Sequence, residues 1–192
     1  VRQADGMPFE FGTITVSDGI SMGTEGMKAS LVSREVIADS IEVVTFGERM
    51  DGLITVAGCD KNMPGCLMAI ARLNVPSIFV YGGTIMPGRF QDRDVSVQDV
   101  FEAVGAHAKG DMSSDQLLDL ECHACPGEGS CAGLFTANTM SAAIETLGMS
   151  LPGDASIPAT DPRRVEESRR AGQTLMRLLE EDLRPRDILT RQ

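Results

Sequence analysis

The chain of 192 residues lacks tryptophan and has one tyrosine, and only three of its 17 basic residues are lysines. Acidic residues number 28, which gives a formal net charge of −11 and a sequence pI near 4.6. A protein that binds the phosphate backbone of a nucleic acid needs a basic surface, so this negative net charge argues against nucleic-acid binding. Eleven methionines accompany the shortage of aromatic rings. They indicate a core that is filled in part by flexible thioether side chains.

Membrane and secretion signals are also missing. A membrane-spanning helix requires an apolar run of about 18 residues, and the sequence has none. Residues 1–6 carry neither the basic cluster nor the apolar stretch of a secretory signal. The five cysteines are an odd number, and cytosolic thiols stay reduced. We therefore predict a cytoplasmic protein with no membrane partner, in which cysteines serve metal binding or catalysis. The missing initiator methionine predicts a piece of a longer protein.

The first half of the chain alternates short apolar runs with helical periodicity. Strands are expected over residues 12–16, 53–57 and 77–81, with helices over residues 28–46 and 66–73 between them. This order is typical of parallel βαβ units. The predicted fold class is α/β, with a parallel sheet and flanking helices, followed by a helix-rich segment.

The second half of the chain is predicted to be helical, over residues 96–108, 116–122, 132–147 and 162–183. Ser96 is expected to cap the first of these helices, and Ser113 or Ser114 the second. The third is mostly apolar, which predicts a buried helix. The charged residues of the last helix, such as Glu166 and Arg170, predict a solvated face.

Polar residues follow each of the three predicted strands. These segments are Ser-Asp-Gly at residues 17–19, Gly-Cys-Asp-Lys at 58–61 and Gly-Gly-Thr at 82–84. Ligands of open parallel sheets bind at the carboxyl ends of the strands. We therefore expect the three segments to converge on one site.

Residues 58–65 carry the densest group of reactive side chains. Cys59, Asp60 and Lys61 stand consecutively at a predicted strand-to-helix turn. A thiolate suits iron or zinc, whereas a carboxylate suits Mg²⁺. The alternative is a polar loop with an incidental buried cysteine.

A second cysteine-rich segment covers residues 122–131. Cys122 and Cys125 form a C-x-x-C pair with His123 between them, and Cys131 follows. This spacing is compatible with a zinc or iron–sulfur knuckle, but the second pair of a zinc ribbon is missing. The alternative is that Cys122 and Cys125 are small core residues. Cys66, inside a predicted apolar helix, is expected to pack in the core.

Taken together, these motifs resemble those of the dihydroxy-acid dehydratase family, which also includes 6-phosphogluconate and other sugar-acid dehydratases. The resemblance covers the whole chain. It rests on residues 17–23 (SDGISMG), 33–35 (SRE), 58–65 (GCDKNMPG), 81–84 (YGGT), 124–127 (ACPG) and 131–140 (CAGLFTANTM). It implies a single N-terminal dehydratase domain over residues 1–192, with an upstream segment and a C-terminal domain outside this chain.

The resemblance implies removal of water from a 2,3-dihydroxy carboxylic acid to give a 2-keto acid, a step in branched-chain amino-acid biosynthesis. It implies a [2Fe–2S] cluster, with [4Fe–4S] as the alternative, and Mg²⁺. By position, Cys59 and Cys131 match cluster ligands, while Asp18 and Asp60 match Mg²⁺ ligands. Lys61 matches a lysine that becomes a Mg²⁺ ligand after carbamylation.

The resemblance also implies that essential groups lie elsewhere. The family's third cluster cysteine lies upstream of residue 1, and its last Mg²⁺-binding glutamate and its serine base lie beyond Gln192. No catalytic residue is therefore expected in this chain, and the chain alone is expected to be inactive. The longer protein is expected to be a homodimer that acts on a small dihydroxy acid.

Two other functions stay open from the sequence. One is dehydration of a sugar acid, such as an aldonate or phosphogluconate, by the same family. The other is an iron–sulfur or metal-binding module without catalysis, built on Cys59, Cys122, Cys125 and Cys131. The second alternative leaves the acidic residues and Lys61 without a role.

Overall fold

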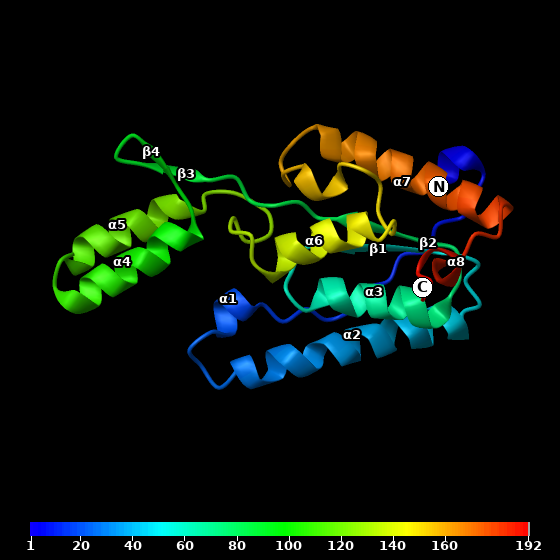
Figure 1. Ribbon diagram of the computed structural model, residues 1–192, viewed down its shortest axis with the longest axis horizontal. Helices are drawn as coiled ribbons and strands as arrows, with labels where there is room; N and C mark the ends of the chain where they lie inside the picture. Colours follow the sequence, from blue (N-terminus) through cyan, green and yellow to red (C-terminus); the bar gives the residue numbers. More distant parts are fainter. Residues whose placement is uncertain (192) are drawn as a thin grey trace.

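The computed structural model describes residues 1–191, and its ribbon is drawn in Figure 1. In chain order the elements are η1 (Arg2–Ala4), α1 (Asp18–Ser21), α2 (Met27–Gly47), β1 (Leu53–Ala57), α3 (Asn62–Leu73), β2 (Ser77–Tyr81), β3 (Gly88–Phe90), β4 (Arg93–Val95), α4 (Val97–Lys109), α5 (Ser114–Ala124), α6 (Thr136–Thr146), η2 (Asp154–Ser156), α7 (Arg163–Glu180) and α8 (Pro185–Ile188). Within residues 1–191, no helix combines the length and the apolar character that crossing a membrane requires.

A parallel sheet of β1 and β2 forms the centre of the molecule, with Leu53 opposite Ser77 and Ala57 opposite Tyr81. The helix α3 connects the two strands, which confirms the predicted βαβ unit. All five residues of β2 are buried. Burial on both faces is typical of a parallel strand that is covered by helices on each side.

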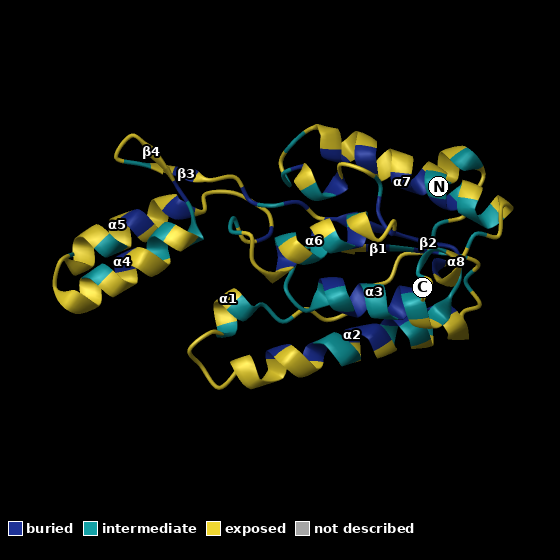
Figure 2. Ribbon diagram, viewed as in Figure 1, coloured by how far each residue is buried: buried dark blue, intermediate teal, exposed yellow. Residues whose placement is uncertain are grey.

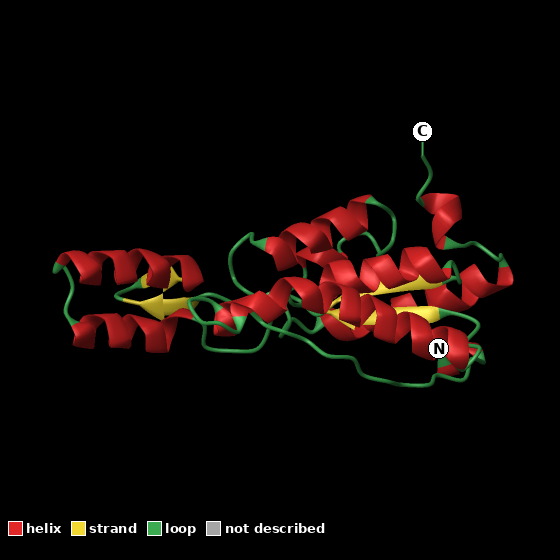
Figure 3. Ribbon diagram, turned by 90° about the horizontal axis from the view of Figure 1, so that it is seen from below, coloured by secondary structure: helices red, strands yellow, loops and turns green. Residues whose placement is uncertain are grey.

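Two apolar clusters lie on opposite faces of this sheet. On one face, Ile37 and Ile41 of α2 and Ile70 of α3 pack with Phe79 of the sheet. On the other face, residues of α7 such as Leu175 pack against β2. Figure 3 shows the strands between these helical layers. The predicted α/β class, with a parallel sheet and flanking helices, is therefore confirmed.

Residues 88–124 form a second region, called the lobe below, which extends away from the sheet (Figure 1). It contains the antiparallel hairpin β3–β4 and the helix pair α4–α5. The lobe has its own buried cluster, which includes Val95, Ala103 and Leu120. Figure 2 shows buried residues where α4, α5 and the hairpin meet, and exposed or intermediate residues elsewhere on the lobe.

The two lobe helices begin at the predicted caps. Ser96 accepts a hydrogen bond from the backbone N–H of Gln98 and forms a capping box with Asp99. Ser113, rather than Ser114, caps α5 and forms a capping box with Gln116. Each box satisfies backbone donors at the start of its helix.

The predicted strand over residues 12–16 is wrong. This segment runs without strand pairing, and Ile14 is exposed. It is held through side chains, because the Thr13 hydroxyl hydrogen-bonds that of Ser40 on α2 and Thr15 accepts from Asn62 Nδ2. The alternation of apolar residues therefore marks an extended segment beside helices and not a third strand of the sheet.

Two predicted helices also need correction. The helix expected over residues 132–147 begins only at Thr136, and its end is not buried, since Leu147 is 46% exposed. On the last helix, Glu166 and Arg170 are exposed as predicted, but the solvated face does not include every charged residue. Arg164 and Glu167 on α7 are buried, and they pair with the buried carboxylate of Asp154 and with Arg170, respectively.

Candidate functional site

A cavity of about 350 Å³ lies where β1 and β2 end. The three segments expected to converge there do so, although only two of them follow strands. A fourth segment, residues 129–131, joins them from the chain after the lobe. The lining residues are Ser17, Asp18, Gly19, Gly58, Cys59, Asp60, Gly82, Gly83, Gly129, Ser130, Cys131, Phe135 and Ala137.

Asp18 is placed by the short helix α1, which begins at this residue after the extended Ser17. The fully buried Ser30 of α2 donates a hydrogen bond to Asp18 Oδ1. The other carboxylate oxygen of Asp18, Oδ2, accepts from Lys61 Nζ at 2.8 Å. Both oxygens are therefore engaged, and the carboxylate has a defined orientation at the edge of the cavity.

The turn that carries Cys59 is fixed by the first residue of α3. Asn62 Oδ1 accepts a hydrogen bond of 2.9 Å from the backbone N–H of Cys59. The amide nitrogen of the same side chain donates to Thr15 Oγ1 at 3.1 Å. Asn62 thus links the turn to the extended segment that leads to Asp18.

Lys61 lies between two carboxylates. Its ammonium group donates to Asp18 and also pairs with Asp60 Oδ2, and these side chains are only 15–16% exposed. Burial favours a raised pKa for Asp18, but hydrogen bonding with Asp60, Lys61 and Ser30 lowers it to about 2. Burial opposes the charged form of Lys61, but its hydrogen bonds to both carboxylates raise its pKa above the usual value. One cation is thus balanced against two anions.

These residues form a partial donor set for a divalent cation. Among residues 1–191, no three His, Cys, Asp or Glu side chains converge as a metal site. Asp18 and Asp60 offer the carboxylate oxygens that Mg²⁺ prefers. The ammonium of Lys61 offers no lone pair and repels a cation, whereas a carbamate on the same nitrogen would add an anionic oxygen. The set would therefore fit Mg²⁺ only with Lys61 in a modified form.

Cys59 and Cys131 face the same cavity as the carboxylates. Both are free thiols. Burial raises the pKa of the Cys131 thiol, and the nearby Cys59 and Asp60 raise it further. The structure thus brings together two thiols from segments that are far apart in the sequence. Thiolates suit a soft metal or an iron–sulfur cluster.

The C-x-x-C pair lies apart from this cavity. Cys122 is exposed on α5, and Cys125 follows the end of that helix. Neither lines the cavity, although Cys125 is near enough to make a small contribution to the raised pKa of Cys131. His123 packs its ring 5.7 Å from that of Phe90 in the lobe. Cys66 is confirmed as a core residue, and burial raises the pKa of its thiol to about 12.

Three residues that hold the site were missed by sequence reasoning. Ser30, Ser130 and Asn138 hydrogen-bond to Asp18, Gly58 and the Cys131 segment, respectively. The sequence feature that could have identified Ser30 is its position as a small polar residue on the apolar face of a predicted helix. Ser130 precedes the motif at residues 131–140, and Asn138 lies within it, but only the cysteine of that motif was assigned a role from the sequence.

Comparison with known families agrees with this arrangement. Residues 1–192 match the family described as dihydroxy-acid/6-phosphogluconate dehydratase N-terminal. The chain belongs to this family. The dehydratase resemblance drawn from the sequence motifs is thereby confirmed over the whole chain.

Relatives within this dehydratase family are closely similar to the chain. It is 62% identical over 191 residues to dihydroxy-acid dehydratase of Natronomonas pharaonis. The matched residues make up 100% of this chain and 32% of that relative. The chain is 59% identical over 192 residues to dihydroxy-acid dehydratase of Haloarcula marismortui, again over 100% of this chain and 33% of the relative. The chain therefore spans about a third of the length of these relatives.

Proposed function

We propose that this chain is the N-terminal part of an enzyme that dehydrates a 2,3-dihydroxy carboxylic acid to a 2-keto acid in branched-chain amino-acid biosynthesis. The observation that carries the proposal is the common cavity of Asp18, Cys59, Asp60 and Cys131 at the end of the sheet. Family membership and the names of the relatives support it. Because those relatives are about three times as long, the activity belongs to a protein that contains this chain.

We assign two roles to four residues that line the cavity and to Lys61, which pairs with two of them. Asp18, Asp60 and a carbamylated Lys61 would hold Mg²⁺, and Cys59 and Cys131 would be ligands of a [2Fe–2S] cluster, with [4Fe–4S] as the alternative. When bound, these groups supply Lewis acidity toward the hydroxyl and carboxylate oxygens of the substrate. Ser30 orients one of the Mg²⁺ ligands through its hydrogen bond to Asp18. Such hydrogen bonds fix the orientation of metal ligands.

The glycines at the strand ends give the substrate access to the backbone. Gly58, Gly82 and Gly83 line the cavity without side chains. Gly83 has a φ of +93°, and a Cβ there would lie 2.5 Å from the backbone nitrogen of Ala159. A glycine is therefore required at Gly83. The base that removes the C2 proton is proposed to lie in the part of the enzyme outside this chain.

The direct test is keto-acid formation after anaerobic cluster reconstitution and addition of Mg²⁺. The enzyme that contains this chain is expected to convert dihydroxyisovalerate to its keto acid, whereas the 192-residue chain alone is expected to be inactive. Absence of turnover by the reconstituted longer enzyme would contradict the proposed reaction. Robust turnover by the isolated chain would contradict the proposal that essential groups lie outside it.

A second candidate is a sugar-acid dehydratase, because the family description also includes 6-phosphogluconate dehydratase. The relative rates on dihydroxyisovalerate and on an aldonic acid distinguish the two, and a higher rate on the first is expected.

We also propose a cytoplasmic homodimer. A metal-binding module without catalysis is disfavoured, because Cys122 and Cys125 do not line the cavity that holds the other two cysteines.

A further inference from the structure

The two cysteines of the cavity are linked through the residues that precede them. The hydroxyl of Ser130 donates a hydrogen bond to the carbonyl oxygen of Gly58. Gly58 is bonded to Cys59, and Ser130 is bonded to Cys131. One side-chain hydrogen bond therefore connects the two cysteine-bearing segments, which belong to different parts of the chain.

The backbone of Ser130 is itself firmly held. Its N–H donates to the carbonyl oxygen of Gly83 at 2.8 Å, and its carbonyl oxygen accepts from the N–H of Ile85 at 2.8 Å. These bonds form a parallel bridge between Ser130 and Thr84 beyond the end of β2. The residue is 7% exposed. Ser130 thus has a fixed position from which its hydroxyl reaches the end of β1.

The glycines around this link are suited to the close approach. A Cβ on Gly58 would lie 2.8 Å from the Ser130 hydroxyl oxygen. Gly129 has a φ of +136°, and a Cβ there would lie 2.4 Å from the backbone nitrogen of Ile85. A side chain at Gly58 would meet the Ser130 hydroxyl itself, and one at Gly129 would clash with the backbone that pairs with Ser130, so the contact depends on both glycines.

The main chain of Cys131 is held on its other side by α6 and by the segment after β2. Its carbonyl oxygen accepts from Asn138 Nδ2 at 2.8 Å and from Thr84 Oγ1 at 3.1 Å. The Tyr81 hydroxyl and Asn138 Oδ1 form a hydrogen bond of 2.5 Å, which orients the amide. The carbonyl of Cys131 is thereby directed to these donors, and the residue lines the cavity.

We infer that Ser130 is a positioning residue that sets the separation and orientation of the Cys59 and Cys131 thiols. The inference rests on the proposed role of these cysteines as metal ligands. Ser130 is not itself assigned as a metal ligand, because its hydroxyl donates a hydrogen bond to the carbonyl oxygen of Gly58. Without that hydroxyl, the Gly58–Cys59 turn and the Cys131 segment lose their direct connection.

Ser150 provides a matched control for Ser130. It is also 7% exposed and also forms an isolated parallel bridge, in this case to Phe79 of β2. Its hydroxyl has no hydrogen-bond partner in the described structure. Ser150→Ala therefore removes a buried hydroxyl of equal exposure without touching the cysteine segments.

The test uses the enzyme that contains this chain, freed of metal, with Cys122 and Cys125 both changed to serine to remove competing thiols. Cd²⁺ is titrated anaerobically, and binding is followed through the ultraviolet absorption of the Cd–thiolate bond. Ser130→Ala is expected to weaken Cd²⁺ binding by about 10- to 100-fold, as loss of supporting contacts to metal ligands does. Ser150→Ala is expected to bind like the parent, and circular dichroism checks that both variants are folded.

Two outcomes would overturn the inference: parental Cd²⁺ affinity in Ser130→Ala, or equal weakening in Ser150→Ala. Cys59→Ser and Cys131→Ser are measured in parallel. If both lose the Cd–thiolate signal while Ser130→Ala binds normally, the positioning role fails and the proposed ligands stand. If neither cysteine variant loses the signal, the proposed ligand pair itself is wrong. Misfolding of Ser130→Ala alone, with Ser150→Ala folded, would contradict a role confined to positioning.

Discussion

The end of the sheet and the lobe use cysteine in different ways. Cys59 and Cys131 are distant in sequence, but the chain returns to the strand ends and brings both to one cavity. Cys122 and Cys125 are close in sequence and have the spacing of a metal knuckle, but neither reaches that cavity. Proximity in the chain is therefore a weaker guide to a binding site than the topology of the sheet.

The two regions can also be compared through one ion pair in each, which differ in their exposure to water. Near the sheet, Arg164 and Asp154 form an ion pair whose side chains are 10% and 2% exposed. In the lobe, Arg89 and Asp94 form a pair in which both side chains are 66% exposed. Water screens the second pair and not the first. The buried pair is thus the one expected to matter for stability.

The largest effect is expected for Lys61→Ala in the enzyme that contains this chain. The change leaves Asp18 and Asp60 without the group that contacts both and removes the nitrogen proposed to carry the carbamate. We expect kcat/KM for the dihydroxy acid to fall by at least about 10³-fold, since a group at a metal centre contributes several kcal/mol. Initial rates of keto-acid formation provide the measurement.

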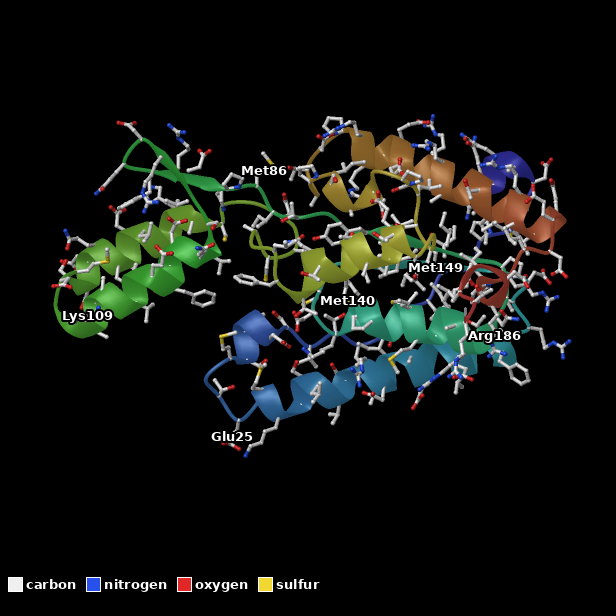
Figure 4. The ribbon with its side chains drawn as sticks, in the orientation of Figure 1. Glu25, Met86, Lys109, Met140, Met149 and Arg186 are labelled. Atoms are coloured by element: carbon white, nitrogen blue, oxygen red, sulfur yellow. The ribbon has the colours of Figure 1, made fainter. Side chains whose placement is uncertain are left out.

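Two further variants separate the proposed carbamate from charge pairing and provide a control. These are Lys61→Arg and Lys109→Ala. Arginine keeps the positive charge but does not form the proposed carbamate, so an equal loss of activity is expected. Lys109 is exposed at the outer end of α4, in the lobe (Figure 4), and its removal is expected to leave the rate unchanged. Normal activity in Lys61→Arg would mean that charge pairing alone is the role of this lysine.

The second effect concerns the stability of the two regions. Arg164→Ala leaves the carboxylate of Asp154 buried without its cation, and the guanidinium also lies 5.6 Å from the centre of the Tyr81 ring. We expect the free energy of unfolding to fall by about 3 kcal/mol, the typical cost of a buried charge without a partner. Urea unfolding followed by circular dichroism measures it.

The matched change in the lobe is Arg89→Ala. It breaks the exposed pair with Asp94, for which no measurable change in unfolding is expected. If both arginine variants lost the same stability, burial would not be what separates the two ion pairs.

A smaller effect is expected from Leu120→Ala in the lobe. Leu120 is 2% exposed in the cluster that α4, α5 and the hairpin share. Its truncation is expected to destabilise the lobe by about 2 kcal/mol, at the lower end for a buried leucine because a small core can relax. Hydrogen exchange is expected to accelerate at the amides of α4 and α5 and to stay slow in β2. Equal acceleration in β2 would show that the lobe does not open independently.

Much of the sheet region could be predicted from the sequence. The expected strands over residues 53–57 and 77–81 coincide with β1 and β2, because both are short apolar runs that end at glycine. The expected site residues Asp18, Cys59 and Cys131 meet at the cavity. Glycine-rich segments at strand ends are strong local signals, and the parallel sheet brings them to one edge.

Other features depend on contacts that the sequence does not reveal. Residues 12–16 alternate like a strand but lie against helices, where Thr13 meets Ser40. The β3–β4 hairpin was not predicted, because its turn residues Gln91 and Asp92 adopt positive φ without a glycine. Burial of Arg164 follows from Asp154, which lies in a separate segment of the chain.

The most direct test of the account is the iron content of the enzyme that contains this chain, measured with its visible absorption spectrum after anaerobic reconstitution. Cys122→Ser combined with Cys125→Ser is expected to retain the iron and the spectrum of the parent. Cys59→Ser and Cys131→Ser are each expected to lose both. Retained iron in the Cys59 and Cys131 variants, together with loss in the Cys122 and Cys125 double variant, would contradict the assignment of the site to the end of the sheet.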